Sequence, residues 1–263
     1  MKKIIVCIKQ VPDPETSASN FKIDEVAKQA IQPKGVSPVL NPFDENALEA
    51  ALQIKDTQEV KITVLSMGRK LDRTVVRASL EVGADELILL EGNTLENFDS
   101  FYTSVVLAAA IKKIGDFDLI LCGRQASDTN NGQVGSVIAE ILGIPIITIA
   151  RKIDILEGKV KVEREITDGF EVAEAPIPVL ITAGRLIGTL REPSIEGFVA
   201  AEKKPINVWS IGELGIDLTQ LKRINFSKLS MPIRDTKCQM IKANSPEESG
   251  VNLALKLREN KIL

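Results

Sequence analysis

The 263-residue sequence predicts an α/β fold built on a doubly wound, mostly parallel, Rossmann-like sheet, with a β-hairpin and an extended C-terminal arm. Apolar runs of strand length alternate with helical patterns through the first two thirds of the chain. These runs are rich in Val, Ile and Leu at every position, which is typical of parallel strands covered by helices on both faces. The alternation ends near residue 150, where a hairpin-like pattern begins.

The first elements follow in strict alternation. The runs 3–9, 61–67 and 85–92 are predicted strands. Between them, the helix 45–55 places its apolar residues at helical spacing, and the helix 71–83 ends at Gly83, a residue that suits the end of a helix. This segment therefore predicts three parallel strands joined by two crossover helices.

The next elements continue the pattern. A long helix over 98–115 leads to a strand over 116–123, a polar loop, a helix from Gln133 to Gly143 and a strand over 144–150. After that, 152–166 alternates polar and apolar residues around a Glu-Gly-Lys turn, and 176–183 is a further strand. These elements complete the predicted domain, 1–204.

The segment 205–263 has many breakers and few periodic stretches before a short helix over 247–260. Its apolar residues, Trp209 among them, do not amount to a core. We therefore expect an arm, 205–263, that packs on a partner chain.

Composition excludes several classes of function. The net charge of −3 disfavours a nucleic-acid surface, and no apolar run approaches the length that spans a bilayer. The N-terminal run IIVCI has no cleavage site after it, so it predicts a first strand rather than a signal peptide, and we expect a cytoplasmic protein.

The chain contains no histidine, which removes Ser-His-Asp, Cys-His and His-metal chemistry. Its three cysteines, Cys7, Cys122 and Cys238, form no CxxC pair, which disfavours an iron–sulfur cluster or a structural zinc site. Function therefore shifts towards binding and cofactor chemistry.

Three segments follow predicted strands directly: 8–13, 66–69 and the loop GRQASDTNNGQVG, 123–135. Since ligands of doubly wound sheets lie beyond the carboxyl ends of the strands, these segments should share one crevice. The loop has polar side chains for a ribose or adenine and glycines that leave backbone N–H groups free for phosphate. A simply capped loop before a helix is an equally good interpretation of its residues.

The motif NPFDENALEAAL, 41–52, is a second candidate. Asn41 and Pro42 precede a helix, and Asp44 is predicted to cap it. In isolation, a plain helix start explains this motif better than a binding site does. The segment Ser66-Met67-Gly68 at a strand end is a weaker candidate still.

The sequence resembles the beta subunits of electron transfer flavoproteins over nearly its whole length. The motifs that carry the resemblance are IKQVPD (8–13), NPFDENALEAA (41–51), LSMG (65–68), VGADELILL (82–90), GRQASD (123–128), QVG (133–135), KVEREI (161–166), and the region from ITAGR (181–185) to AAEKKPI (200–206). The resemblance implies an adenine-nucleotide-binding α/β domain whose C-terminal arm embraces the alpha subunit of a heterodimer. The implied nucleotide-binding residues are Cys7, Asn41, Asp44, Ser66, Met67, Gly123, Arg124, Asp128, Asn131, Gln133, Val134, Gly135 and Ser136.

The family has two branches, and the resemblance favours one. In one branch the pocket holds a structural AMP, the family motif has a cysteine after Asn-Pro-Phe, and the loop reads Asn-Gln-Thr-Gly. Here Asp44 follows Phe43, and the loop reads Gly132-Gln133-Val134-Gly135, as in the electron-bifurcating branch. That branch implies a pocket FAD that takes a hydride from NADH within the complex. One electron would go to ferredoxin or flavodoxin and one, through the alpha-subunit FAD, to an acyl-CoA dehydrogenase or reductase-type flavoenzyme.

The resemblance also implies a partner-recognition loop over 184–200. Its exposed aliphatic tip falls on Ile195, and Glu165 would orient the loop. A lone surface hydrophobe is the alternative for Ile195. Two other functions stay open: a redox-inert subunit that holds AMP, and a free-standing adenine-nucleotide enzyme, for which the phosphate-gripping glycine loop and metal-binding acids are missing.

Overall fold

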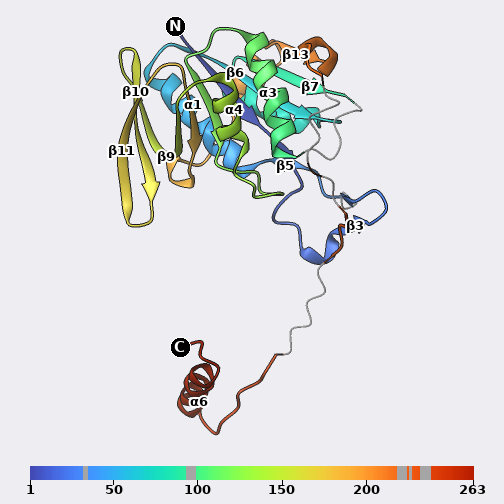
Figure 1. Cartoon of the computed structure of the whole chain (residues 1–263), viewed down its shortest axis with the longest axis vertical. Coiled ribbons are helices and arrows are strands. Elements are labelled where there is room, and N and C mark those ends of the chain that lie inside the picture. The colour runs from blue at the N-terminus through green and yellow to red at the C-terminus, as the bar shows by residue number, and fades with distance from the viewer. Residues whose placement is uncertain (32–34, 93–98, 218–223, 225–226, 232–237) are drawn as a thin grey trace. The chain divides into compact units, whose positions relative to one another are not determined.

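The computed structural model describes residues 1–31, 35–92, 99–217, 224, 227–231 and 238–263 (Figure 1). The chain divides into two compact units, 1–229 and 230–263. Within the predicted arm, 218–223, 225–226 and 232–237 lie outside the described residues, as does the first residue of the helix predicted over 98–115.

A nine-stranded sheet forms the centre of the first unit, in the order β11-β10-β9-β12-β8-β1-β6-β7-β13. Its strands are β1 (Lys2–Ile8), β6 (Val60–Gly68), β7 (Glu86–Glu91), β8 (Leu119–Gly123), β9 (Ile146–Ile155), β10 (Lys159–Ile166), β11 (Gly169–Pro176), β12 (Val179–Ala183) and β13 (Ile206–Trp209). From β9 to β13 in this order, each strand is parallel to its neighbour. β10 pairs antiparallel with both β9 and β11. The predicted fold class is confirmed.

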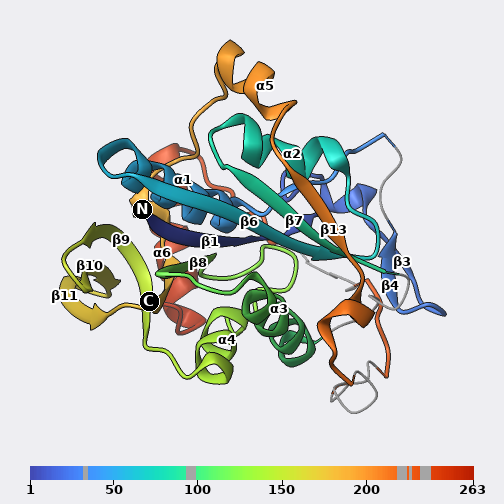
Figure 2. The same cartoon turned by 90° about the horizontal axis from the view of Figure 1, so that it is seen from above.

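Helices cover both faces of this sheet. Figure 2 shows α1 (Pro42–Thr57) and α2 (Arg73–Glu81) on one face and α3 (Ser100–Ile114) and α4 (Val134–Leu142) on the other. Two apolar clusters result: Leu48 and Val76 belong to one, and Ile111 and Ile138 to the other. Burial on both faces explains why the central strands are apolar throughout.

The chain reverses its winding between β1 and β8, which are neighbours in the sheet. The helix that follows β1 covers one face, and the helix that follows β8 covers the other. At such a switch point the two connections separate, and a crevice opens beyond the carboxyl ends of the strands.

The segment after residue 150 differs in part from the prediction. The hairpin forms as expected, with Gly158 at φ +70 in its turn, and β11 extends it by a strand that the sequence analysis missed. β13 pairs in parallel with β7, so 206–209 form a strand of the main sheet, which the sequence analysis did not predict. A four-residue edge strand has too short a pattern to be distinguished from a loop.

Smaller elements complete the two units. Between β1 and α1, β2 (Gln10–Val11) pairs with β5 (Val39–Leu40), and β3 (Lys22–Asp24) forms a hairpin with β4 (Gln29–Ile31). The second unit contains α6 (Pro246–Glu259), close to the helix predicted over 247–260. Among the described residues, no helix has the length and apolar character needed to cross a membrane.

Candidate functional site

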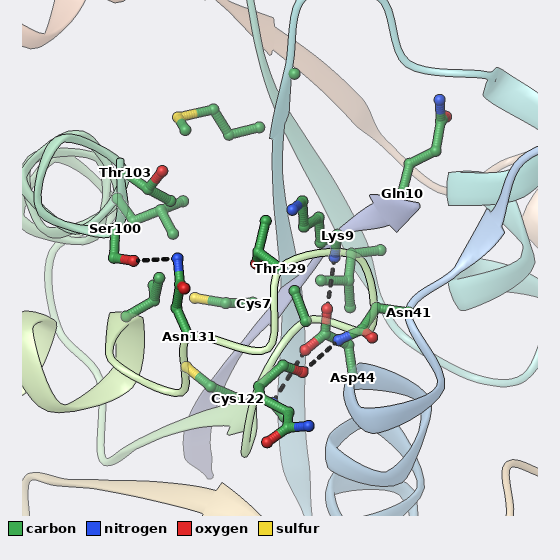
Figure 3. Close-up of a pocket in the computed structure, with 18 of the residues that line it drawn as sticks. Cys7, Lys9, Gln10, Asn41, Asp44, Ser100, Thr103, Cys122, Thr129 and Asn131 are labelled. Carbon is green, nitrogen blue, oxygen red and sulfur yellow. Dashed lines mark hydrogen bonds between the residues drawn. The ribbon is translucent and has the colours of Figure 1, made fainter. Parts of the chain in front are cut away.

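A pocket of about 660 Å³ lies beyond the carboxyl ends of β1, β6 and β8, at the switch point of the sheet (Figure 3). Its lining comes from segments far apart in the sequence, namely 7–10, 67–71, 122–126 and 131–135, with side chains from α1 and α3. The three strand-end segments that the sequence analysis assigned to one crevice therefore meet in one pocket. Its volume is in the range of small-molecule and cofactor sites.

The buried side chain of Asp44 joins the two strands at the switch point. Its carboxylate accepts a hydrogen bond from the backbone N–H of Lys9 at 2.7 Å and another from the backbone N–H of Gly123 at 3.1 Å. Burial raises the pKa of Asp44 to about 7, although Asn41, both backbone donors and the charge of Lys9 act in the opposite direction. Because its oxygens accept these backbone hydrogen bonds, Asp44 is a positioning residue and not a free base.

This arrangement corrects the prediction that Asp44 caps α1. The helix begins at Pro42, and its N-cap is Asn41, whose side chain makes no cap hydrogen bond. Asn41 instead accepts from the backbone N–H of Ser127 at 3.0 Å and donates to the Gln125 carbonyl at 2.8 Å. The motif therefore supports the polar loop as well as starting the helix.

The loop 124–133 is held by its own side chains. Gln125 donates to the amide oxygen of Asn130 at 2.9 Å, and Asn131 donates to the Ser100 hydroxyl of α3 at 2.9 Å. Asn130 has φ +53, a left-handed conformation that asparagine tolerates better than most residues. The loop is thus fixed between α1 and α3, on the open side of the pocket.

An ion pair links the loop to β1. Lys9 donates to both oxygens of Asp128, at 2.8 and 2.6 Å. Both side chains are partly exposed, so this ion pair stabilises the loop by roughly 0.2–1 kcal/mol. It also neutralises the one lysine that lies directly after β1.

The N-terminus of α4 faces the pocket without a side-chain cap. Gln133 is the N-cap residue and makes no cap hydrogen bond, while Val134 and Gly135 line the pocket. A Cβ on Gly135 would lie 2.9 Å from Cγ2 of Thr182, so glycine is needed for α4 to pack this closely on β12. Free N–H groups at a helix start favour an anion.

Arg124 adds a positive charge to the lining of the same pocket. Its guanidinium lies 4.9 Å from the centre of the Phe43 ring. The Nε of Arg124 and the Oγ of Ser127 are buried and have no hydrogen-bond partner within the described residues. Buried donors are normally satisfied, and Arg124 lines the pocket, so its Nε together with the uncapped helix start fits a bound group with phosphate oxygens.

Most of the predicted nucleotide-binding residues line the pocket: Cys7, Asn41, Asp44, Met67, Gly123, Arg124, Asn131, Gln133, Val134 and Gly135. Three do not. Ser66 is fully buried in β6, Asp128 pairs with Lys9, and Ser136 is exposed on α4. The binding roles of all these residues stay predictions.

The sequence analysis missed several lining residues, among them Ser100, Thr103 and Cys122. Each stands at the carboxyl end of a strand or in the first turn of a helix that follows one. That position, applied evenly to every strand of the sheet, is the signal that could have identified them. Within the described residues, no cluster of acidic, cysteine or histidine side chains is suited to hold a metal ion.

The two predicted partner-binding residues lie away from the pocket. Glu165 accepts from the backbone N–H of Leu186 at 3.4 Å, at the short helix η2 (Arg185–Ile187). Ile195 is 80% exposed and is the first residue of α5 (Ile195–Ala201), capped by Ser194. The segment predicted as a loop over 184–200 is therefore partly helical.

The stretch between these residues is fixed on α1. Arg191 donates through its backbone and guanidinium to Glu49 and also to Asp56, over 2.8–3.1 Å. Asn46 donates to the Gly188 carbonyl at 2.6 Å. The pKa of Arg191 is raised by its hydrogen bonds to Asp56 and Glu49. Ile195 thus projects from a supported segment.

A family model and individual relatives both match the chain to the same protein family. The family model described as "Electron transfer flavoprotein domain" matches residues 30–214. An electron transfer flavoprotein subunit beta from Megasphaera elsdenii is 46% identical over 211 residues, which cover 78% of this chain and 76% of that protein.

Two further relatives extend the match. The caffeyl-CoA reductase-Etf complex subunit CarD from Acetobacterium woodii is 37% identical over 267 residues, 99% of this chain and 100% of that protein. An electron transfer flavoprotein subunit beta from Mycobacterium tuberculosis is 33% identical over 234 residues, 86% of this chain and 85% of that protein.

Proposed function

Because this chain belongs to the electron transfer flavoprotein family, as a beta subunit that pairs with an alpha subunit, we propose that its pocket binds FAD in an electron-bifurcating complex. Two features of one pocket carry this proposal: the buried Nε of Arg124, which has no hydrogen-bond partner among the described residues, and the uncapped start of α4. A guanidinium and free helix N–H groups are the donors that a pyrophosphate requires.

The chain's own residues would divide the binding between them. Arg124 and the first-turn N–H groups of α4 would hold the pyrophosphate, and Asn131 and Thr129 would offer an amide and a hydroxyl to the ribose. Asp44 would keep the ends of β1 and β8 at a fixed distance beneath the ligand. Bound FAD would supply hydride acceptance from NADH and single-electron transfer, so no side chain here needs to act as a general base.

A redox-inert pocket that holds AMP is the alternative, since AMP also presents a phosphate to Arg124. Two observations favour FAD. Asp44 stands where the AMP branch of the family typically has a cysteine, and Gln133-Val134-Gly135 replaces its Gln-Thr-Gly. CarD, which matches nearly the whole chain, is named as part of a caffeyl-CoA reductase complex, which supports a CoA-thioester-reducing flavoenzyme as partner.

The partner surfaces follow from the same proposal. The C-terminal arm would embrace the alpha subunit. This arm includes the second compact unit of the chain, 230–263, which contains α6. Ile195 would insert into an acyl-CoA dehydrogenase or reductase-type partner, and Glu165 would orient the segment that precedes it. Ferredoxin or flavodoxin would be the low-potential acceptor.

Counting cofactors in the purified heterodimer tests the proposal. We expect two FAD molecules per heterodimer and no AMP; one FAD with one AMP would refute bifurcation. In the same complex, NADH should reduce ferredoxin only when the CoA-thioester acceptor is present.

A matched pair of variants connects this result to the pocket. Arg124→Met should weaken the second FAD by about 10- to 100-fold, since hydrogen bonds to charged groups contribute ~1.5–3 kcal/mol. Arg151→Met is the control, because Arg151 also stacks on a phenyl ring, that of Phe170 at 4.6 Å, and does not line the pocket. Equal FAD affinity in both variants would contradict the role of Arg124.

A further inference from the structure

Two cysteines from neighbouring strands lie side by side at the floor of the pocket. Cys7 of β1 is in register with Cys122 of β8, and both line the pocket (Figure 3). Registered residues of adjacent parallel strands point to the same face, and the strands are about 4.8 Å apart. Both thiols are free, and each residue is buried except where it borders the pocket.

The surroundings keep the Cys122 thiol neutral. The pKa of the Cys122 thiol is raised well above its usual range, first by its hydrogen bond with Cys7 and then by burial. Leu107, Met67 and Val134 border the same cavity and provide an apolar wall. A ligand that bonds to both sulfurs and leaves a neutral product suits this apolar site better than a cation.

A divalent metal ion does not fit. Structural zinc takes four ligands, whereas no third acidic, cysteine or histidine side chain completes a metal cluster among the described residues. The nearby carboxylate of Asp44 already accepts two backbone hydrogen bonds. The site therefore offers two sulfur ligands and open apolar space above them.

We propose that Cys7 and Cys122 form a binding site for trivalent arsenicals that carry one organic group. An arsenic atom with an aryl substituent needs only two thiols from the protein. In the reaction, two S–H bonds and the arsenic–oxygen bonds break, two As–S bonds form, and the oxygen leaves with both protons as water. Arsenic stays trivalent, no electron is transferred, and the aryl group occupies the pocket.

The test uses phenylarsine oxide on the complex of the full chain with its alpha subunit, after removal of bound nucleotide. Intact mass of this chain should increase by one phenylarsenic group less two hydrogens. 2,3-Dimercaptopropanol should remove the group, whereas the monothiol 2-mercaptoethanol should not, because only a dithiol competes with a two-sulfur chelate. Removal by the monothiol at equal thiol concentration would overturn the proposal.

Variants locate the site. Cys7→Ser and Cys122→Ser should each lose the adduct, and Cys238→Ser, the control at the exposed cysteine, should keep it. If either serine variant fails to fold, peptide mapping of the labelled wild-type chain decides the matter: the arsenic should link the peptides that contain Cys7 and Cys122. An adduct on Cys238 alone would refute the site, and so would full labelling of both Cys7→Ser and Cys122→Ser.

Discussion

The carboxylate of Asp44 accepts a hydrogen bond from the backbone N–H of Gly123, 79 positions away in the sequence, at 3.1 Å. The contact brings the first turn of α1 against the end of β8. A Cβ on Gly123 would lie 2.5 Å from Oδ1 of Asp44 and 2.5 Å from the Phe43 carbonyl carbon. Only glycine allows this approach, which determines the shape of the pocket floor.

Gly123→Ala should therefore destabilise the fold and weaken nucleotide binding. The clashing atoms belong partly to the backbone, which cannot rotate away, so we expect a loss of ~1–3 kcal/mol in the free energy of unfolding. Urea denaturation measures it. Gly212→Ala is the control, because its nearest neighbour is 3.9 Å away and its φ is not positive. Equal free energies of unfolding for the two variants would show that Asp44 and Phe43 move aside to accommodate the added Cβ at position 123.

Asp44→Asn should change how stability depends on pH. Burial raises the pKa of Asp44 to about 7 in the folded state, from 3.8. Between these two pH values, Asp44 keeps its proton in the folded chain and loses it in the unfolded chain. Its contribution to the free energy of unfolding is therefore full at low pH and is lost as the pH rises towards 7.

The free energies of unfolding of wild type and Asp44→Asn, measured at steps from pH 4 to 8, isolate this effect. The wild type should lose stability relative to the variant up to pH 7, and the difference should be constant above it. A constant offset, from the poorer hydrogen bonding of an amide, is also expected, at ~1–3 kcal/mol. A difference that does not change with pH would mean that the hydrogen bonds to Asp44 and the charge of Lys9 offset the effect of burial on its pKa.

Arg191→Met should destabilise the chain by ~1–3 kcal/mol, because Glu49 is buried and would lose its charged donor. The segment between β12 and α5 should then open, which hydrogen exchange over 186–192 would detect. Lys159→Met removes an exposed ion pair with Glu174, which solvent screens, and should cost clearly less stability than Arg191→Met. Equal losses would argue against a special role for Arg191.

Ile195→Ser should leave stability within ~0.5 kcal/mol of wild type, since the side chain is 80% exposed. If Ile195 fills a pocket on the acyl-CoA-type partner, electron transfer to that partner should fall by ~10-fold or more, with unchanged FAD content. Val26→Ser, at another exposed residue, is the control. Unchanged transfer in both variants would reduce Ile195 to an ordinary surface hydrophobe.

Sequence reasoning succeeded where structure is local or periodic. The apolar runs at 3–9 and 116–123 became neighbouring central strands, because strands buried on both faces leave no polar positions. Gly143 ends α4 at φ +67, as the pattern before it predicts. The edge strand β13 and the helix α5 were missed, because each is short and is supported mainly by distant contacts: α5 packs with Gly197 against the Glu81 carbonyl of α2.

The sequence by itself determined the fold class, the order of the central strands and their crossover helices, the family and the segments that border the pocket. The tertiary structure decided what individual side chains do there. Asp44 is a local helix-start signal in the sequence, yet its partners are the ends of two strands. Cys7 and Cys122 are separate apolar-run residues until strand register places them together. Which strands become neighbours in the sheet depends on contacts between segments far apart in the sequence, and the apolar pattern of one strand does not identify its neighbour.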